Sequence, residues 1–162
     1  MTARSNGGWQ QMNEPVVAEF RASGGQVSRK HPVILLTTIG RRSGRPHTTP
    51  LNFSRDGGRV VVIASKGGST THPDWFHNLV ARPEVTIEDG GDSYRARAVV
   101  APEPERTRLF DAQARLMPFF DAGRRTAGGF DAGIEHAMRA VIRSTMPAGF
   151  ALRPIVTSRS SA

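Results

Sequence analysis

Three apolar, β-branched runs follow one another at close spacing in the first half of the sequence. They cover Val33–Ile39, Thr48–Phe53 and Arg59–Ser65, and only short glycine-containing stretches separate them. Connections of this length join antiparallel strands as hairpins, whereas parallel strands need a crossover of a dozen or more residues. The sequence therefore predicts an antiparallel meander.

Two further strands, Glu84–Glu88 and Ser93–Val100, are predicted on either side of the glycine-rich turn at 89–92. Helices are predicted over residues 14–23, 73–82 and 104–117, because proline suits a first helical turn and glycine ends the first of these segments. Five or six antiparallel strands with interspersed helices predict an α+β fold, mainly β, built as a small closed or split barrel.

The two ends of the chain are expected to behave differently. Residues 1–13 are polar and aperiodic and are predicted to be a flexible segment, followed by one domain over residues 14–162, a size typical of a single core. Within that domain, a further helix is predicted toward the C-terminus, because five apolar residues recur at helical spacing: Ile134, Ala137, Met138, Val141 and Ile142. Residues 150–156 are compatible with a last strand.

Composition excludes several classes of protein. The chain has no cysteine, which rules out disulfides, thiolate metal sites and a cysteine nucleophile. Its apolar runs are too short to span a bilayer, and its N-terminus lacks the apolar stretch of a signal peptide. We expect a cytoplasmic protein, a monomer or homodimer, with peripheral membrane association left open.

The turn between the first two predicted strands, within "LLTTIGRRSGRPHTTPL", carries unusual charge. The formal net charge is +8, and almost all of the cations are arginines. Arg41, Arg42 and Arg45 lie in one glycine-containing turn, where guanidinium groups and backbone N–H groups together suit a phosphate or carboxylate. The alternative from the residues alone is a solvated hairpin tip.

Other segments carry weaker signals. "ASKGG" (64–68) places a lysine and two glycines at a strand end, where a backbone can approach a ligand closely. His72 and His77 lack the additional ligands that a metal site needs, so no metal is expected. Neither a G-x-S-x-G elbow nor a G-x-G-x-x-G fingerprint is present, which argues against a serine hydrolase and a conventional dinucleotide site.

Four segments in order resemble the deazaflavin (coenzyme F-420)-dependent nitroreductase family, reductases with a split β-barrel, FMN-binding-like fold. They are "EFRASGGQV", "LLTTIGRRSGRPHTTPL", "VVIASKGGSTTHPDWFHNLVARPEVTI" and "YRARAVVAPEPERTRLFD". The resemblance implies that the arginine-rich turn and the lysine loop hold the phosphate and acidic tail of F-420, and that the strand after the turn backs its ring. The implied cofactor-binding residues are Arg41, Arg42, Ser43, Arg45, Thr48, Thr49, Pro50, Leu51, Ala64, Ser65, Lys66, Gly67, Gly68, Trp75, Asn78 and Leu79.

The resemblance also implies the activity, hydride transfer from reduced F-420 to an apolar conjugated acceptor such as a nitroaromatic, a quinone or an enone. The chain departs from the family pattern on the acceptor side. The resemblance implies tyrosines in the acceptor pocket, whereas Tyr94 is the one tyrosine of this chain. Phe119 and Phe120 are therefore predicted to supply the aromatic surface for the acceptor. Relative to the family, about 121–147 is also predicted to be an insert that contains the extra helix. No catalytic acid or base can be assigned.

Three alternatives remain at this stage. A non-catalytic F-420 carrier would keep the coenzyme residues without an acceptor pocket, and an FMN-dependent reductase would use the simpler flavin. A nucleic-acid partner is disfavoured, because the arginine-rich turn lacks the interleaved aromatic residues of a single-strand platform.

These alternatives differ in a measurable way. F-420 should bind more tightly than FMN, because the basic turn matches a long polyanionic tail that FMN lacks, and its affinity should fall as salt screens the ion pairs. Fluorescence titration with each coenzyme at increasing sodium chloride measures both effects. Stronger binding of FMN than of F-420 would contradict the prediction. A dissociation constant for F-420 that does not change with salt concentration would also contradict it.

Overall fold

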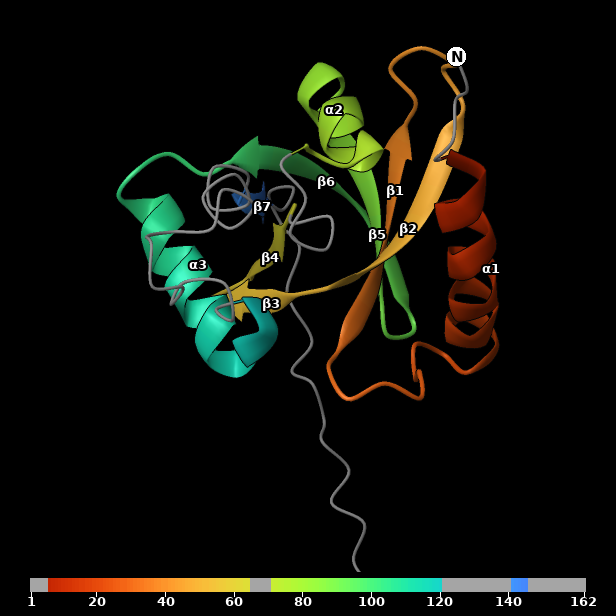
Figure 1. Cartoon of the computed structure of the whole chain (residues 1–162), viewed down its shortest axis with the longest axis horizontal. Coiled ribbons are helices and arrows are strands. Elements are labelled where there is room, and N and C mark those ends of the chain that lie inside the picture. Colours follow the sequence, from red (N-terminus) through yellow and green to blue (C-terminus); the bar gives the residue numbers. More distant parts are fainter. Residues whose placement is uncertain (1–5, 65–70, 121–140, 146–162) are drawn as a thin grey trace, which may run out of the picture.

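The computed structural model describes residues 6–64, 71–120 and 141–145. Its described strands form one antiparallel sheet in the order β2-β1-β5-β6-β7-β4-β3 (Figure 1). The predicted antiparallel pairing and the hairpin of β1 with β2 are confirmed. The three-strand meander is wrong, because β4 pairs with β3 and β7 and not with β2. The strands are β1 (Val33–Ile39), β2 (Pro46–Asn52), β3 (Ser54–Asp56), β4 (Arg59–Ile63), β5 (Glu84–Asp89), β6 (Asp92–Val100) and β7 (Val141–Thr145).

The two edge strands of this sheet are consecutive in the chain. β2 ends at Asn52, β3 begins at Ser54, and Phe53 alone lies between them. The sheet must therefore curve until its two edges approach each other, and the ribbon from β2 to β3 crosses the open side in Figure 1. Phe53 is buried within the core at this crossing. The three-residue strand β3 was not predicted.

Strand β4 contributes to two separate cores, because successive side chains of a strand point to opposite faces. Val60 and Val62 belong to the barrel core, a cluster that also includes residues of β1, β5, β6 and α2. Val61 and Ile63 pack on the other face with buried residues of helix α3, namely Leu109, Phe110 and Ala114.

The described helices are α1 (Asn6–Ala22), α2 (Asp74–Ala81), α3 (Glu105–Leu116) and the short 3-10 helix η2 (Pro118–Phe120). The positions predicted for α2 and α3 are confirmed to within a residue or two. The predicted start of the first helix is wrong: α1 begins at Asn6, inside the segment expected to be flexible, and Pro15 lies within it. Among the side chains of α1 that the structure describes, the buried apolar ones are Val16 and Phe20, both in its second half. The polar first half gave no periodic signal from which to predict a helix.

The predicted helix through Val141 and Ile142 is also wrong at those residues. They lie in β7, which pairs with β4 on one side and with β6 on the other. Both strand partners are distant in sequence, so local spacing could not reveal the pairing. Val141 and Ile142 are β-branched residues, which favour strands, although their spacing resembled that of a helix. Residues 121–140, 146 and 147 of the predicted insert, together with the possible strand at 150–156, lie outside the described residues.

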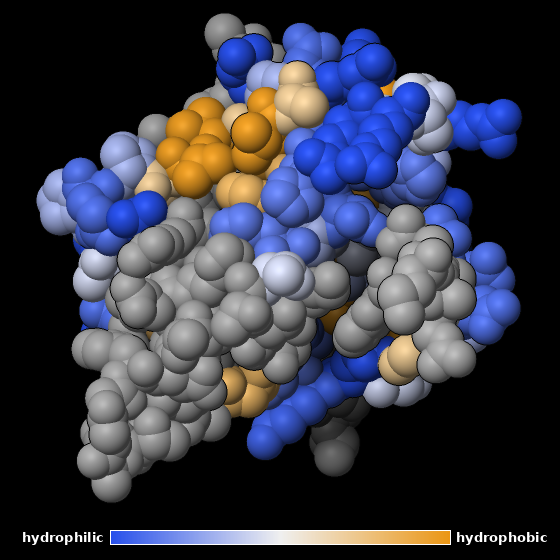
Figure 2. Space-filling view, turned by 45° about the horizontal axis from the view of Figure 1, so that its top comes forward, coloured by the Kyte–Doolittle hydropathy of each residue, from blue (hydrophilic) through white to orange (hydrophobic). Residues whose placement is uncertain are grey.

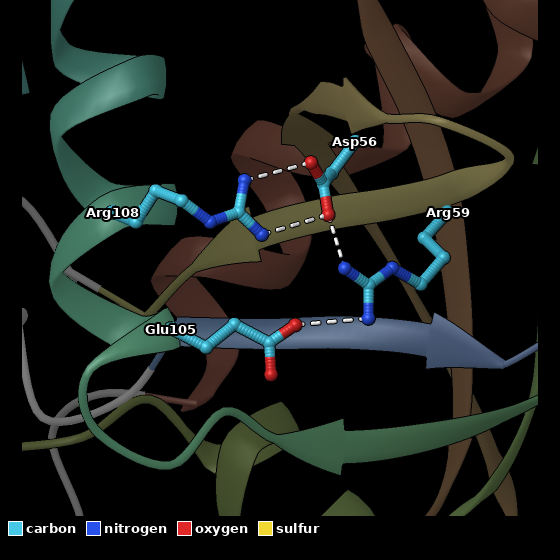
Figure 3. A network of polar contacts seen from close by, with 4 residues as sticks. All are labelled: Asp56, Arg59, Glu105 and Arg108. Atoms are coloured by element: carbon cyan, nitrogen blue, oxygen red, sulfur yellow. Dashed lines mark hydrogen bonds and ion pairs between the residues drawn. The ribbon is translucent and has the colours of Figure 1, made fainter.

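A polar network attaches α3 to the β3–β4 hairpin (Figure 3). Arg108 of α3 donates two hydrogen bonds to the Asp56 carboxylate, at 2.9 and 3.1 Å. Arg59 also donates to Asp56 and forms an ion pair with Glu105 of α3, at 2.9 Å. The hydrogen bonds from Arg108 and Arg59 hold the pKa of Asp56 well below its ordinary value. The network thus ties an edge of the sheet to the helix that covers the second core.

Because its pKa is depressed in the folded state, Asp56 stabilises the fold above the ordinary carboxyl pKa of 3.8, and this stabilisation is lost as the pH falls below that value. We predict that Asp56→Asn lowers the free energy of unfolding by about 1 kcal/mol at pH 7, as a partly exposed network allows. Urea unfolding at pH 7, 4 and 3 measures the difference in free energy of unfolding between the parent and Asp56→Asn. This difference should become smaller as the pH falls.

Glu84→Gln is the matched control, because Glu84 pairs with Arg95 at 3.5 Å while both side chains are largely exposed. It should change stability less at every pH. A difference between the parent and Asp56→Asn that stays constant down to pH 3 would show that the ionised carboxylate is not what stabilises this junction.

Candidate anion-binding site

The arginine turn, residues 40–45, connects β1 to β2 and is held by its own backbone. Gly40 N–H donates to the Arg45 carbonyl at 2.8 Å, and Gly44 N–H donates to the Gly40 carbonyl at 2.9 Å. Gly44 has φ = +68°, a conformation that other residues rarely adopt. A Cβ on Gly40 would lie 2.3 Å from Ser43 Oγ. The positive φ of Gly44 therefore favours glycine, and a side chain at Gly40 would require Ser43 and His47 to move.

Ser43 and His47 complete the internal bonding of the turn. Ser43 Oγ accepts the Arg45 N–H at 3.2 Å and lies 3.3 Å from His47 Nε2. Ser43 was predicted as an anion ligand, and its hydroxyl is already engaged within the turn. His47 was not predicted, although it lies two residues after the turn, within the same sequence motif.

The three arginines of the turn differ from most others in their surroundings. Arg41, Arg42 and Arg45 are exposed, and within the described residues none of their guanidinium groups forms an ion pair. By contrast, ion pairs are formed by Arg21, Arg55, Arg59, Arg95, Arg106 and Arg108. Figure 2 shows that the end of the molecule carrying this turn is mostly hydrophilic, next to an apolar area.

The tip of the turn also offers backbone donors. Gly40, Arg41, Gly44 and Arg45 each donate their N–H group to a protein oxygen. For Arg42 and Ser43, the part of the chain that the structure describes provides no acceptor. Two adjacent N–H groups beside guanidinium groups are the kind of donors that bind phosphate or carboxylate oxygens.

The four predicted residues of β2 are split between the two faces of the strand. Thr49 and Leu51 are paired with Leu36 and Ile34, which belong to the barrel core. Thr48 and Pro50 lie on the opposite face, and the hydroxyls of Thr48 and Thr37 are 2.8 Å apart. The side chains of Thr48, Thr49, Pro50 and Leu51 cannot therefore all line the same ring. Pro50 is compatible with β2 because the strand is at the sheet edge.

Helix α2 brings one predicted residue to the turn and buries two others. Asn78 is buried, and its Oδ1 accepts the backbone N–H of Arg41 at 3.1 Å. Trp75 and Leu79 are packed in the barrel core, as is Ala64 at the end of β4. Ser65, Lys66, Gly67 and Gly68 lie outside the described residues.

The predicted acceptor residues lie at the other end of β1. Phe119 is 51% exposed, and its ring centroid is 5.5 Å from that of His31, which precedes β1. The arginine turn follows the last residue of β1, a seven-residue strand, so the two regions are about 20 Å apart at roughly 3.3 Å per residue. Figure 1 places them at opposite ends of the molecule. The side chain of Phe120 lies outside the described part of the chain.

Among the described residues, no group of three or more histidines and carboxylates is arranged to hold a metal ion. No described helix is long and apolar enough to cross a membrane.

Comparisons with known proteins agree with the fold and with the resemblance. Residues 9–127 match the family model for F-420H(2)-dependent quinone reductase. An F-420H(2)-dependent quinone reductase of Mycobacterium tuberculosis is 35% identical over 99 residues, which cover 57% of this chain and 66% of that protein. The chain thus spans slightly less than two thirds of this relative.

Solved structures share the architecture. An F-420-H2-dependent reductase, FDR-A, is 26% identical with a TM-score of 0.57, covering 70% of this chain and 94% of that chain. A domain-swapped dimer is 23% identical with a TM-score of 0.59, covering 87% and 100%, which supports the fold alone. The predicted split β-barrel is confirmed, and this chain belongs to the F-420H(2)-dependent quinone reductase family.

Proposed function

We propose that this chain is an oxidoreductase that binds coenzyme F-420 and reduces a quinone-type acceptor. The observation that carries the proposal is the arginine turn, whose three exposed guanidinium groups have no acidic partner among the described residues. A coenzyme with a phosphate and an acidic tail supplies the missing negative charge. Family membership supports the same assignment.

The residues present fit the anionic part of this coenzyme. Arg41, Arg42 and Arg45 hold phosphate or carboxylate oxygens, and the N–H groups of Arg42 and Ser43 donate to the same oxygens. When bound, reduced F-420 supplies the hydride. The protein supplies orientation, with the half-buried strand β2 beside the turn as the surface for the ring. Lys66 and its glycines complete the site in this proposal.

A quinone is the acceptor that the family favours, and nitroaromatics and enones are further conjugated candidates with the same need for an apolar surface. β2 runs antiparallel to β1, so it leads from the arginine turn back toward the end at which Phe119 lies. A ring placed along β2 would bring the acceptor closer to Phe119. The assignment of Phe119 and Phe120 to the acceptor site therefore stays a prediction.

Arg42→Glu should raise the dissociation constant for F-420 at least about tenfold, because a charge-assisted hydrogen bond contributes roughly 1.5–3 kcal/mol. Arg115→Glu is the matched control: it makes the same charge reversal at an exposed position near the end of α3. Fluorescence titration measures both variants. Equal weakening in both would indicate a general charge effect, and unchanged binding of Arg42→Glu would remove the proposed site.

Phe119→Ala tests the acceptor side. If Phe119 contacts the acceptor, KM for a soluble quinone should rise about two- to tenfold, the contribution of an aromatic contact, while the dissociation constant for F-420 stays unchanged. His31→Ala is the control for the ring contact between Phe119 and His31, and steady-state oxidation of reduced F-420 is the assay.

Two results would count against the acceptor side of the proposal. An unchanged KM for Phe119→Ala would place the acceptor elsewhere. Tight F-420 binding without oxidation by quinones, nitroaromatics or enones would favour the carrier alternative.

A further inference from the structure

We infer that Asn78 is a positioning residue that fixes the arginine turn for anion binding, and that it does not itself contact the coenzyme. The resemblance implied a direct contact, so this inference replaces that role with a different one. The inference rests on the proposed function, because the anion that the arginine turn would bind is the tail of F-420.

Both polar atoms of the Asn78 side chain are used inside the protein. Its Oδ1 accepts the Arg41 N–H at 3.1 Å, and its Nδ2 donates to Thr38 Oγ1 at 3.2 Å. The Arg41 N–H can only donate, so it fixes which end of the amide faces the turn. Asn78 is 7% exposed and Thr38 is 0% exposed. Because the side chain of Asn78 is buried and both of its polar atoms are already hydrogen-bonded, it is poorly placed to contact a ligand.

The bond to Asn78 differs from the other bonds of the turn. The bonds from Gly40, Gly44 and Arg45 stay within residues 40–45. Among the described contacts of these backbone N–H groups, the bond from Arg41 is the one that reaches another element, helix α2. It connects positions 37 residues apart in sequence. Asn78 thereby orients the turn relative to the barrel rather than merely closing it.

This bond acts next to the donors that face the ligand. Arg41 precedes Arg42 and Ser43, whose N–H groups form the tip. The Arg41 peptide group is anchored on α2, and α2 is itself held by Trp75 and Leu79 in the barrel core. A rigid core thus sets the position of the backbone of the turn, so that less backbone entropy is lost when an anion binds there.

The test compares two ligands: F-420, and its deazaflavin riboside fragment, which lacks the phosphate and tail. Asn78→Ala should raise the dissociation constant for F-420 roughly three- to tenfold, the effect of losing one or two hydrogen bonds. It should leave the dissociation constant for the riboside unchanged within about twofold, since the turn binds the tail. The dependence of F-420 binding on salt should also become weaker.

A second pair of variants keeps the test independent of whether Asn78→Ala folds. Thr38→Val removes the hydroxyl that fixes the Asn78 amide and preserves shape, whereas Thr38→Ser keeps the hydroxyl. The inference expects Thr38→Val to weaken F-420 binding selectively and Thr38→Ser to bind like the parent. Thermal unfolding of all variants records any general loss of stability.

The outcomes are distinguishable. Equal losses for F-420 and the riboside would show that Asn78 contacts the ring or acts only on the fold, and no loss for F-420 would show that the turn needs no anchor; either result overturns the inference. A parent protein that binds neither ligand would overturn the proposed function, and with it this role of Asn78.

Discussion

The fold depends on the passage of the chain through Phe53. One residue separates the two edge strands, so β2 and β3 cannot lie at opposite sides of a flat sheet. Curvature is thus imposed by connectivity, and burial of Phe53 stabilises it, because a large apolar side chain at the crossing fills the interior. A closed interior in turn gives α2 a core to dock on, which sets the position of the arginine turn.

The second core follows from the same curvature. Once β4 is curved around the barrel, its alternating Val and Ile side chains need cover on the outer face as well, and α3 supplies it. The carboxylate of Asp56 sits where the hairpin meets that helix, bonded by arginines from both sides. Polar contacts here specify the docking of α3, while apolar burial provides most of the free energy.

Local features of this molecule could be predicted and distant ones could not. β1, with the predicted bounds, and the β5–β6 turn are encoded by consecutive residues. β7 was missed because its identity as a strand depends on β4 and β6, about 80 and 45 residues earlier. The site divides in the same way: the arginine turn is a cluster in sequence, whereas the bond between Asn78 and Arg41 exists only after folding.

The charge pattern bears on whether the arginine turn is a binding site or a solvated hairpin tip. The chain places acidic partners beside Arg55, Arg59 and Arg108, whereas Arg41, Arg42 and Arg45 lie exposed within a single turn. Leaving three guanidinium groups together costs little in water, where two unit charges several ångströms apart repel by less than about 1 kcal/mol.

A solvated tip needs neither the steric constraint at Gly40 nor an anchor on a buried asparagine. Those two features fix the backbone that carries the three arginines and the adjacent N–H donors, and a fixed backbone at this place has a physical purpose when an anion binds to it. The shape of the turn, more than its charge, therefore favours the binding site.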